Sequence, residues 1–139
     1  MSVAPAAGSS AAAKKLGIKA GTRAVVLNAP DGAIGKLEPL PDGASVTPRA
    51  TKNAGDVVVL FAPDSAAVRA WLTKAVDAGK PRGLLWVCYP KGGKKAGTDL
   101  NRDLLWAQLG EHGLTGVTLV AFDDTWSAMR FRPADEVGT

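Results

Sequence analysis

The fold is decided by the stretch Asp56-Val57-Val58-Val59-Leu60-Phe61-Ala62-Pro63. Three consecutive valines disfavour a helix and fit a pleated surface that is covered on both faces, so residues 56–61 are predicted to form a central strand. A helix capped by Asp64 or Ser65 should follow and end at Gly79. Its apolar positions repeat at the spacing of one helical face: Val68, Trp71, Leu72, Ala75 and Val76.

Similar units flank this stretch. Alternating strands and helices imply parallel pairing with right-handed crossovers, and two final strands around an Asp-Asp turn indicate an antiparallel hairpin. We therefore predict an α/β fold: a single three-layer Rossmann-like domain with a mostly parallel sheet and a C-terminal antiparallel hairpin. The other predicted strands are residues 23–28, 44–47, 84–89, 115–122 and 126–132, and a second helix is predicted from Thr98 or Asp99 to about Leu109.

The length and composition are those of one domain. The chain has 139 residues, of which 46% are hydrophobic and 22% are charged, which is enough to bury one core. The Ala-, Ser- and Gly-rich residues 1–13 are predicted to be a disordered tail, residues 14–132 the Rossmann-like domain, and residues 133–139 a frayed C-terminus.

Charge and cysteine content narrow the classes of function. Seventeen Lys and Arg against 13 Asp and Glu leave a formal charge of +4, without the clustered basicity that is typical of sequence-specific nucleic-acid binding. Cys88 is the only cysteine, so neither a disulfide within the chain nor a cysteine-based metal site is expected. No apolar run approaches the ~20 residues of a membrane span. A cytoplasmic protein without a membrane or metal partner is expected.

Five short motifs resemble an uncharacterised bacterial family. They are Lys14-Lys15-Leu16-Gly17-Ile18-Lys19, Leu27-Asn28-Ala29-Pro30, Tyr89-Pro90-Lys91, Thr98-Asp99-Leu100 and Asp123-Asp124-Thr125-Trp126-Ser127. In this order they are similar to the domain-of-unknown-function family numbered three thousand and fifty-two, over residues 14–132. Tyr89 and Asp124 depart from the Trp and Glu of that pattern. The resemblance implies no established activity.

The order of elements also resembles a shortened methyltransferase variant of the doubly wound sheet. That resemblance implies a cofactor beside the loop that follows the first strand. The loop Asn28-Ala29-Pro30-Asp31-Gly32 has only one glycine, and its proline lacks an N–H group. No acidic residue follows the second strand, where Thr47 and Pro48 stand, to hold a ribose. Neither S-adenosylmethionine nor NAD is therefore expected, and no cofactor is predicted.

A basic loop carries the main functional hypothesis. Lys91, Lys94 and Lys95 precede the helix expected to start near Thr98, and free N–H groups at a helix start favour anions. The sequence lacks the ending of a Walker motif, so a solvated loop is the simple alternative. We predict a non-enzymatic binding or regulatory domain with an anion-binding rim at the carboxyl ends of the strands. Its ligand-binding residues are Asn28, Tyr89, Lys91, Lys94, Lys95, Thr98 and Trp126, for a small anionic ligand.

Two alternatives stay open. One is a residual methyltransferase-like enzyme, for which no catalytic residue can be named: the single histidine, His112, lies near a helix end, and Cys88 sits in an apolar strand. The other is a homodimeric interaction module, because the second helix is apolar around most of its circumference. Its predicted interface residues are Leu105, Trp106 and Leu109.

Overall fold

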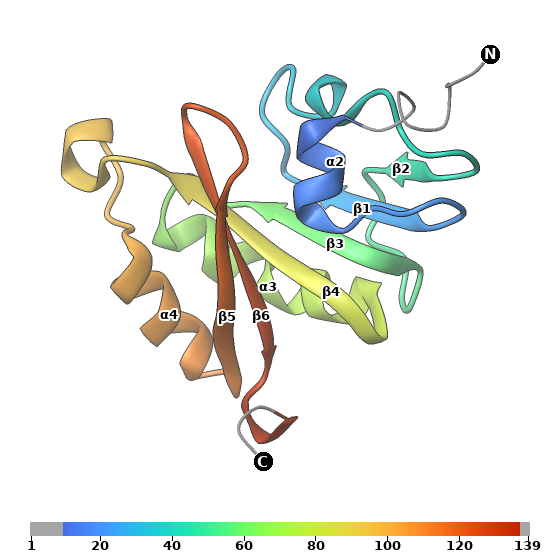
Figure 1. The fold of residues 1–139 in the computed structure, drawn as a ribbon. Helices are drawn as coiled ribbons and strands as arrows, with labels where there is room; N and C mark the ends of the chain where they lie inside the picture. The colour runs from blue at the N-terminus through green and yellow to red at the C-terminus, as the bar shows by residue number, and fades with distance from the viewer. Residues whose placement is uncertain (1–9, 137–139) are drawn as a thin grey trace.

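The computed structural model describes residues 10–136, which form one six-stranded sheet in the order β2-β1-β3-β4-β6-β5 (Figure 1). The strands β2, β1, β3 and β4 are parallel, β6 is antiparallel to β4, and β5 is antiparallel to β6. The prediction of a mixed α/β domain with a mostly parallel sheet and antiparallel C-terminal strands is confirmed. The strands are β1 (Arg23–Leu27), β2 (Ser45–Thr47), β3 (Gly55–Phe61), β4 (Gly79–Pro90), β5 (Leu114–Ala121) and β6 (Trp126–Pro133).

The helices lie on both faces of the sheet. The α-helices are α2 (Ala11–Leu16), α3 (Ser65–Ala78) and α4 (Arg102–Gly110), and short 3-10 helices are η1 (Gly35–Leu37), η2 (Gly93–Ala96) and η3 (Ala134–Glu136). No helix between residues 10 and 136 is both long and apolar enough to cross a membrane.

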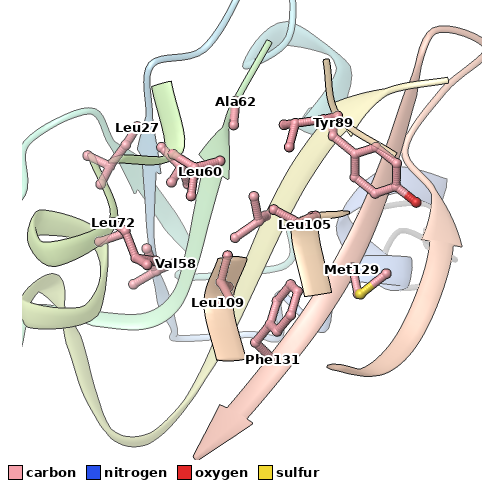
Figure 2. Packing of buried hydrophobic residues seen from close by; sticks show 14 of the residues in the cluster. Leu27, Val58, Leu60, Ala62, Leu72, Tyr89, Leu105, Leu109, Met129 and Phe131 are labelled. Atoms are coloured by element: carbon pink, nitrogen blue, oxygen red, sulfur yellow. The ribbon is translucent and has the colours of Figure 1, made fainter. Parts of the chain in front are cut away.

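The face that carries α3 and α4 holds one half of the core. Val58 and Leu60 point to this face from β3 and meet Leu72 of α3 (Figure 2). The side chains of Leu105 and Leu109 reach it from α4. Asp64 accepts a hydrogen bond from the Ala67 N–H group and begins α3 where the sequence predicts.

The other face is covered by α2 and η1. The alternate side chains of β3, Val57, Val59 and Phe61, are buried there together with Trp86 of β4. The indole Nε1 of Trp86 donates to the Leu16 carbonyl at 2.9 Å, which fixes the end of α2 on the sheet. Burial on both faces is the physical reason why β3 is continuously apolar.

Two predicted boundaries differ from the structure. Residues 11–13 are not part of a tail, because they open α2, where Ala12 and Ala13 are buried and Ser10 accepts a hydrogen bond from the Ala13 N–H group. Residues 1–9 of the predicted tail and residues 137–139 lie outside the described residues. The second predicted helix, α4, begins at Arg102 rather than at Thr98 or Asp99, because Asn101 supplies the cap.

Candidate functional site

The carboxyl ends of β1 and β3 lie at a point where the strand order reverses. The chain leaves β1 for β2 on one side and returns to β3 on the other. Asn28 directly follows β1 with a left-handed backbone, φ +55°, and its Nδ2 donates to the Phe61 carbonyl at 2.9 Å. This bond ties the ends of the two strands together. Open α/β sheets bind ligands in the crevice at such a point. We call the edge formed by the ends of β1, β3 and β4 the carboxyl edge.

The loop after β1 presents backbone donors. In the part of the chain that the structure describes, the N–H groups of Ala29, Asp31 and Gly32 make no hydrogen bond to protein atoms. Pro30 has no N–H group, and its carbonyl accepts from Ala33. The sequence shows that Pro30 lacks an N–H group, and this absence argues against a ligand at the loop. It does not show that the three N–H groups around Pro30 are unbonded, because their hydrogen-bond partners depend on the path of the loop.

An ion pair joins this loop to the β5–β6 hairpin. The Nζ of Lys36 lies 2.5 Å from Oδ2 of Asp123, whose other oxygen accepts from the N–H groups of Thr125 and Trp126 at 2.8 and 2.7 Å. Burial raises the pKa of Asp123, but the hydrogen bonds from Lys36, Trp126 and Thr125 together lower it below the usual value. Asp123 therefore shapes the turn, as its sequence position suggests, and Lys36 is a residue of this edge that the sequence does not reveal.

The predicted pocket residues lie on opposite faces of the sheet. Trp126 packs edge-on against Phe61, with ring centroids 5.2 Å apart, on the face of α2. Tyr89 is buried on the face of α3 and α4 (Figure 2). Burial raises the pKa of Tyr89, and a hydrogen bond with Ser127 partly opposes that shift. Asn28 and Trp126 belong to the carboxyl edge, but Tyr89 does not line a common pocket with Trp126.

The basic loop is arranged differently from the prediction. Lys94 and Lys95 are exposed in η2, and Lys91 is exposed beside the hairpin, where its N–H donates to Thr125. Thr98 is buried, with its Oγ1 accepting from the Leu100 N–H group, and so does not open a helix. The three lysines therefore do not precede a helix start directly. An anion-binding role for this loop stays a prediction.

The same loop is fastened to α3 by a contact that the sequence does not indicate. Asp99 accepts hydrogen bonds from the N–H and hydroxyl groups of Ser65 at 2.8 and 2.5 Å. These hydrogen bonds to Ser65, first its hydroxyl and then its backbone, lower the pKa of Asp99. Asp99 is thus a second acceptor at the start of α3 rather than the cap of the next helix.

The predicted interface does not form one exposed surface. Leu105 and Leu109 are fully buried against the sheet, because α4 turns them toward Met129 and Phe131. Trp106 remains 43% exposed on the same helix. Self-association stays a prediction, and Leu105 and Leu109 are not available to carry it.

Two other kinds of site, a metal site and a reactive cysteine, were considered in the described residues. Within residues 10–136, no group of three or more His, Cys, Asp or Glu residues could hold a metal ion. Cys88 is buried, and this burial raises the pKa of its thiol. A thiol with a raised pKa is a poor nucleophile.

Comparison with known proteins finds likenesses among solved structures. No protein-family model matches the chain, so the resemblance to the domain-of-unknown-function family stays a prediction, and no curated protein matches it. Among solved structures, LepI in complex with SAM is 16% identical, with a TM-score of 0.47, over 87% of this chain and 38% of LepI. A pericyclic reaction enzyme is 12% identical, with a TM-score of 0.49, over 90% of this chain and 47% of that enzyme. The chain spans less than half the length of either.

These likenesses correct the leading functional prediction. The sequence favoured a non-enzymatic binding or regulatory domain, whereas the similar solved structures are LepI with bound SAM and an enzyme for pericyclic reactions. By this finding, the prediction of a non-enzymatic domain is wrong.

Proposed function

We propose that this chain is a methyltransferase-like enzyme whose small-molecule site lies at the carboxyl ends of β1 and β3. One observation carries the proposal: the N–H groups of Ala29, Asp31 and Gly32 have no partner within residues 10–136 at the point where the strand order reverses. Backbone donors at this position of a doubly wound sheet are suited to the oxygen atoms of a ligand.

The finer fold assignment belongs to this proposal. The antiparallel β6 lies between β4 and β5, as the resemblance to a shortened methyltransferase fold implies. In this view α3 and α4 form one outer layer, and α2 with η1 forms a reduced outer layer on the other face. The loop after β1 then occupies the place of a cofactor loop.

The cofactor to test is SAM, S-adenosylmethionine, which is named for the LepI structure. The unbonded N–H groups suit the carboxylate of its methionine part. No side chain suits its ribose in the usual way, because Thr47 ends β2, its Oγ1 accepts from the Arg49 N–H group, and Pro48 follows. The residues present thus fit one end of SAM and not the other, and we derive no transfer step.

The proposal is tested by isothermal titration of SAM into the wild-type protein and the variant Asn28→Asp. Aspartate tolerates the left-handed backbone, and its charge should repel the carboxylate of SAM. It also loses the hydrogen bond that Nδ2 of Asn28 donates to the Phe61 carbonyl, so the melting temperature of this variant must be compared with that of the wild type. The matched control is Asn53→Asp, because Asn53 has the same backbone conformation, φ +56°, and lies before β3 at the opposite edge. Thermal melts of the three proteins report folding.

We expect saturable SAM binding to the wild type and to Asn53→Asp, with affinity reduced about tenfold, or 1.4 kcal/mol, in Asn28→Asp. Methionine should compete with SAM, and adenosine should not. The proposal fails if the wild type gives no saturable signal, or if the two variants bind SAM equally.

A further inference from the structure

A small hollow lies between the second half of α3 and the turn that joins α4 to β5. Its volume is about 150 Å³, the size of a cavity that holds one benzene ring. Because α3 ends where the chain enters β4, the hollow lies toward the edge of the sheet opposite the carboxyl edge. We call it the α3 hollow. Its lining residues are Leu72, Thr73, Val76 and Asp77 of α3, His112 of the turn, and Leu114 at the start of β5.

The floor of the α3 hollow is apolar. Leu72 and Val76 are one helical turn apart on α3, and Leu114 completes this surface from β5. Leu72 is buried in the core, whereas Val76 is 44% exposed although it belongs to the apolar stripe of its helix. An apolar surface that stays exposed inside a hollow favours a ligand with an apolar body of about one ring.

Three polar side chains also line the hollow. Thr73 and Asp77 are one turn apart on α3, beside the apolar pair, and His112 comes from the turn. Within residues 10–136 these three side chains make no hydrogen bond and no ion pair. A carboxylate and a hydroxyl both accept hydrogen bonds, and a neutral imidazole has one acceptor nitrogen. The hollow therefore offers acceptors that no donor of the described chain uses.

The negative charge of Asp77 is not balanced by the lysines nearest to it in the sequence. Asp77 lies in the last turn of α3, where the backbone carbonyls leave a partial negative charge, and that turn contains no basic residue. The ammonium group of Lys74 lies over the Trp71 ring, 5.2 Å from its centroid, and Lys80 pairs with Asp56 at 2.9 Å. An acid at the end of a helix is unfavourable, and a bound cation would offset that cost.

We infer that the α3 hollow binds a primary ammonium compound with an apolar body of one ring. The ring rests on Val76 and Leu114, and the ammonium group lies beside Asp77. An ammonium group has three N–H donors and no acceptor, which matches the carboxylate, the hydroxyl and the neutral imidazole of the hollow. The hollow is separate from the carboxyl edge, so this inference does not depend on the proposed enzyme function.

The probe for this inference is phenethylamine, which is protonated at neutral pH. It is titrated into the full chain and followed by the amide resonances of Thr73, Asp77 and Leu114. Ethylamine tests the charged head group alone, phenethyl alcohol the ring with a neutral head group, and phenylpropionate the ring with a negative charge. We expect saturable shifts with phenethylamine, at a dissociation constant of about 1 mM or lower, since one ring and one exposed ion pair bind weakly. The other three compounds should not saturate at the same concentrations.

Asp77→Asn keeps the size of the side chain and removes its charge. It should weaken phenethylamine binding about fivefold, a modest factor because the carboxylate is exposed and solvent screens it. The matched control is Asp124→Asn, because Asp124 is also an exposed acid without an ion pair within residues 10–136, and it lies away from the hollow in the β5–β6 turn. The control should bind phenethylamine as the wild type does. Thermal melts of both variants report folding.

The absence of saturation with phenethylamine would overturn the inference directly, and so would equal affinities of Asp77→Asn and Asp124→Asn. Binding of phenethyl alcohol or phenylpropionate as tight as that of phenethylamine would make the hollow merely apolar. Binding of ethylamine as tight as that of phenethylamine would reduce the hollow to a charged surface without a site for a ring. Either of these two results would also overturn the inference.

Discussion

The ammonium group of Lys36 lies 2.5 Å from the carboxylate of Asp123, although 86 residues separate them in the chain. Lys36 follows β1 and Asp123 precedes β6, so this pair links the segment after β1 to the β5–β6 turn. Asp123 also accepts two backbone hydrogen bonds within the hairpin turn. One side chain thus holds a local turn and a long-range contact.

Asp123→Asn should lower the free energy of unfolding at pH 7 by roughly 1 kcal/mol. The ion pair is lost, but its Lys36 side is 55% exposed and screened by solvent, which limits the loss. Because the pKa of Asp123 is lowered in the folded protein, its stabilisation is present above the unfolded value of about 3.9 and disappears as the pH falls through the folded pKa. Urea unfolding between pH 2.5 and 7 should show a flatter acid limb for the variant.

Asp124→Asn is the matched control for that measurement. Asp124 is adjacent and exposed, and its side chain makes no ion pair within residues 10–136. Its variant should keep the pH profile of the wild type. Identical acid limbs for wild type and Asp123→Asn would contradict the role given to Asp123.

Gly83→Ala should destabilise the protein by about 1–3 kcal/mol, because the added methyl group meets three backbone oxygens that cannot move independently of the sheet. Gly110→Ala is the comparison: the space around Gly110 is open and it lies in α4, so alanine should raise the free energy of unfolding by up to about 0.5–1 kcal/mol. Chemical denaturation measures both. Equal stability of the two variants would be inconsistent with the packing of the turn at Gly83.

Arg82→Gly should raise the melting temperature, because glycine adopts a φ of +68° without the strain of a side chain, a gain of about 1 kcal/mol. Arg82→Gln removes the same charge but keeps the strain, and should show no such gain. A differential scanning calorimeter compares the two variants. If both raise the melting temperature equally, charge and not backbone strain is the cause.

Self-association, if it uses α4, should depend on Trp106 and the neighbouring Leu104, which are 43% and 53% exposed. We expect a concentration-dependent dimer in sedimentation that Trp106→Glu dissociates without a change in circular dichroism. Lys74→Glu on α3 introduces the same charge on another exposed surface and should leave the dimer intact. A monomer at high micromolar concentration in the wild type would remove this interface.

The sequence by itself determined those helices and strands that are specified by local patterns of residues. The valines of β3 require cover on both faces, the apolar stripe from Val68 requires a helix, and Asp64 begins that helix. These are local patterns of side-chain shape and spacing. The terminal hairpin followed for the same reason, since a turn sequence separates two strand patterns.

Tertiary structure alone decided which of these residues meet. Tyr89 and Trp126 come to opposite faces because β6 pairs in a register that places Tyr89 beside Ser127, and a shift of one residue would exchange the faces. The start of α4 also depends on a distant contact: Asp99 accepts hydrogen bonds from Ser65, and Asn101 caps the helix instead. The β4–β6 ladder ends at one particular pair, Leu85 and Phe131. The register of the β4–β6 ladder and the point where it ends arise from contacts between segments that are distant in the sequence. Local sequence patterns therefore do not predict them.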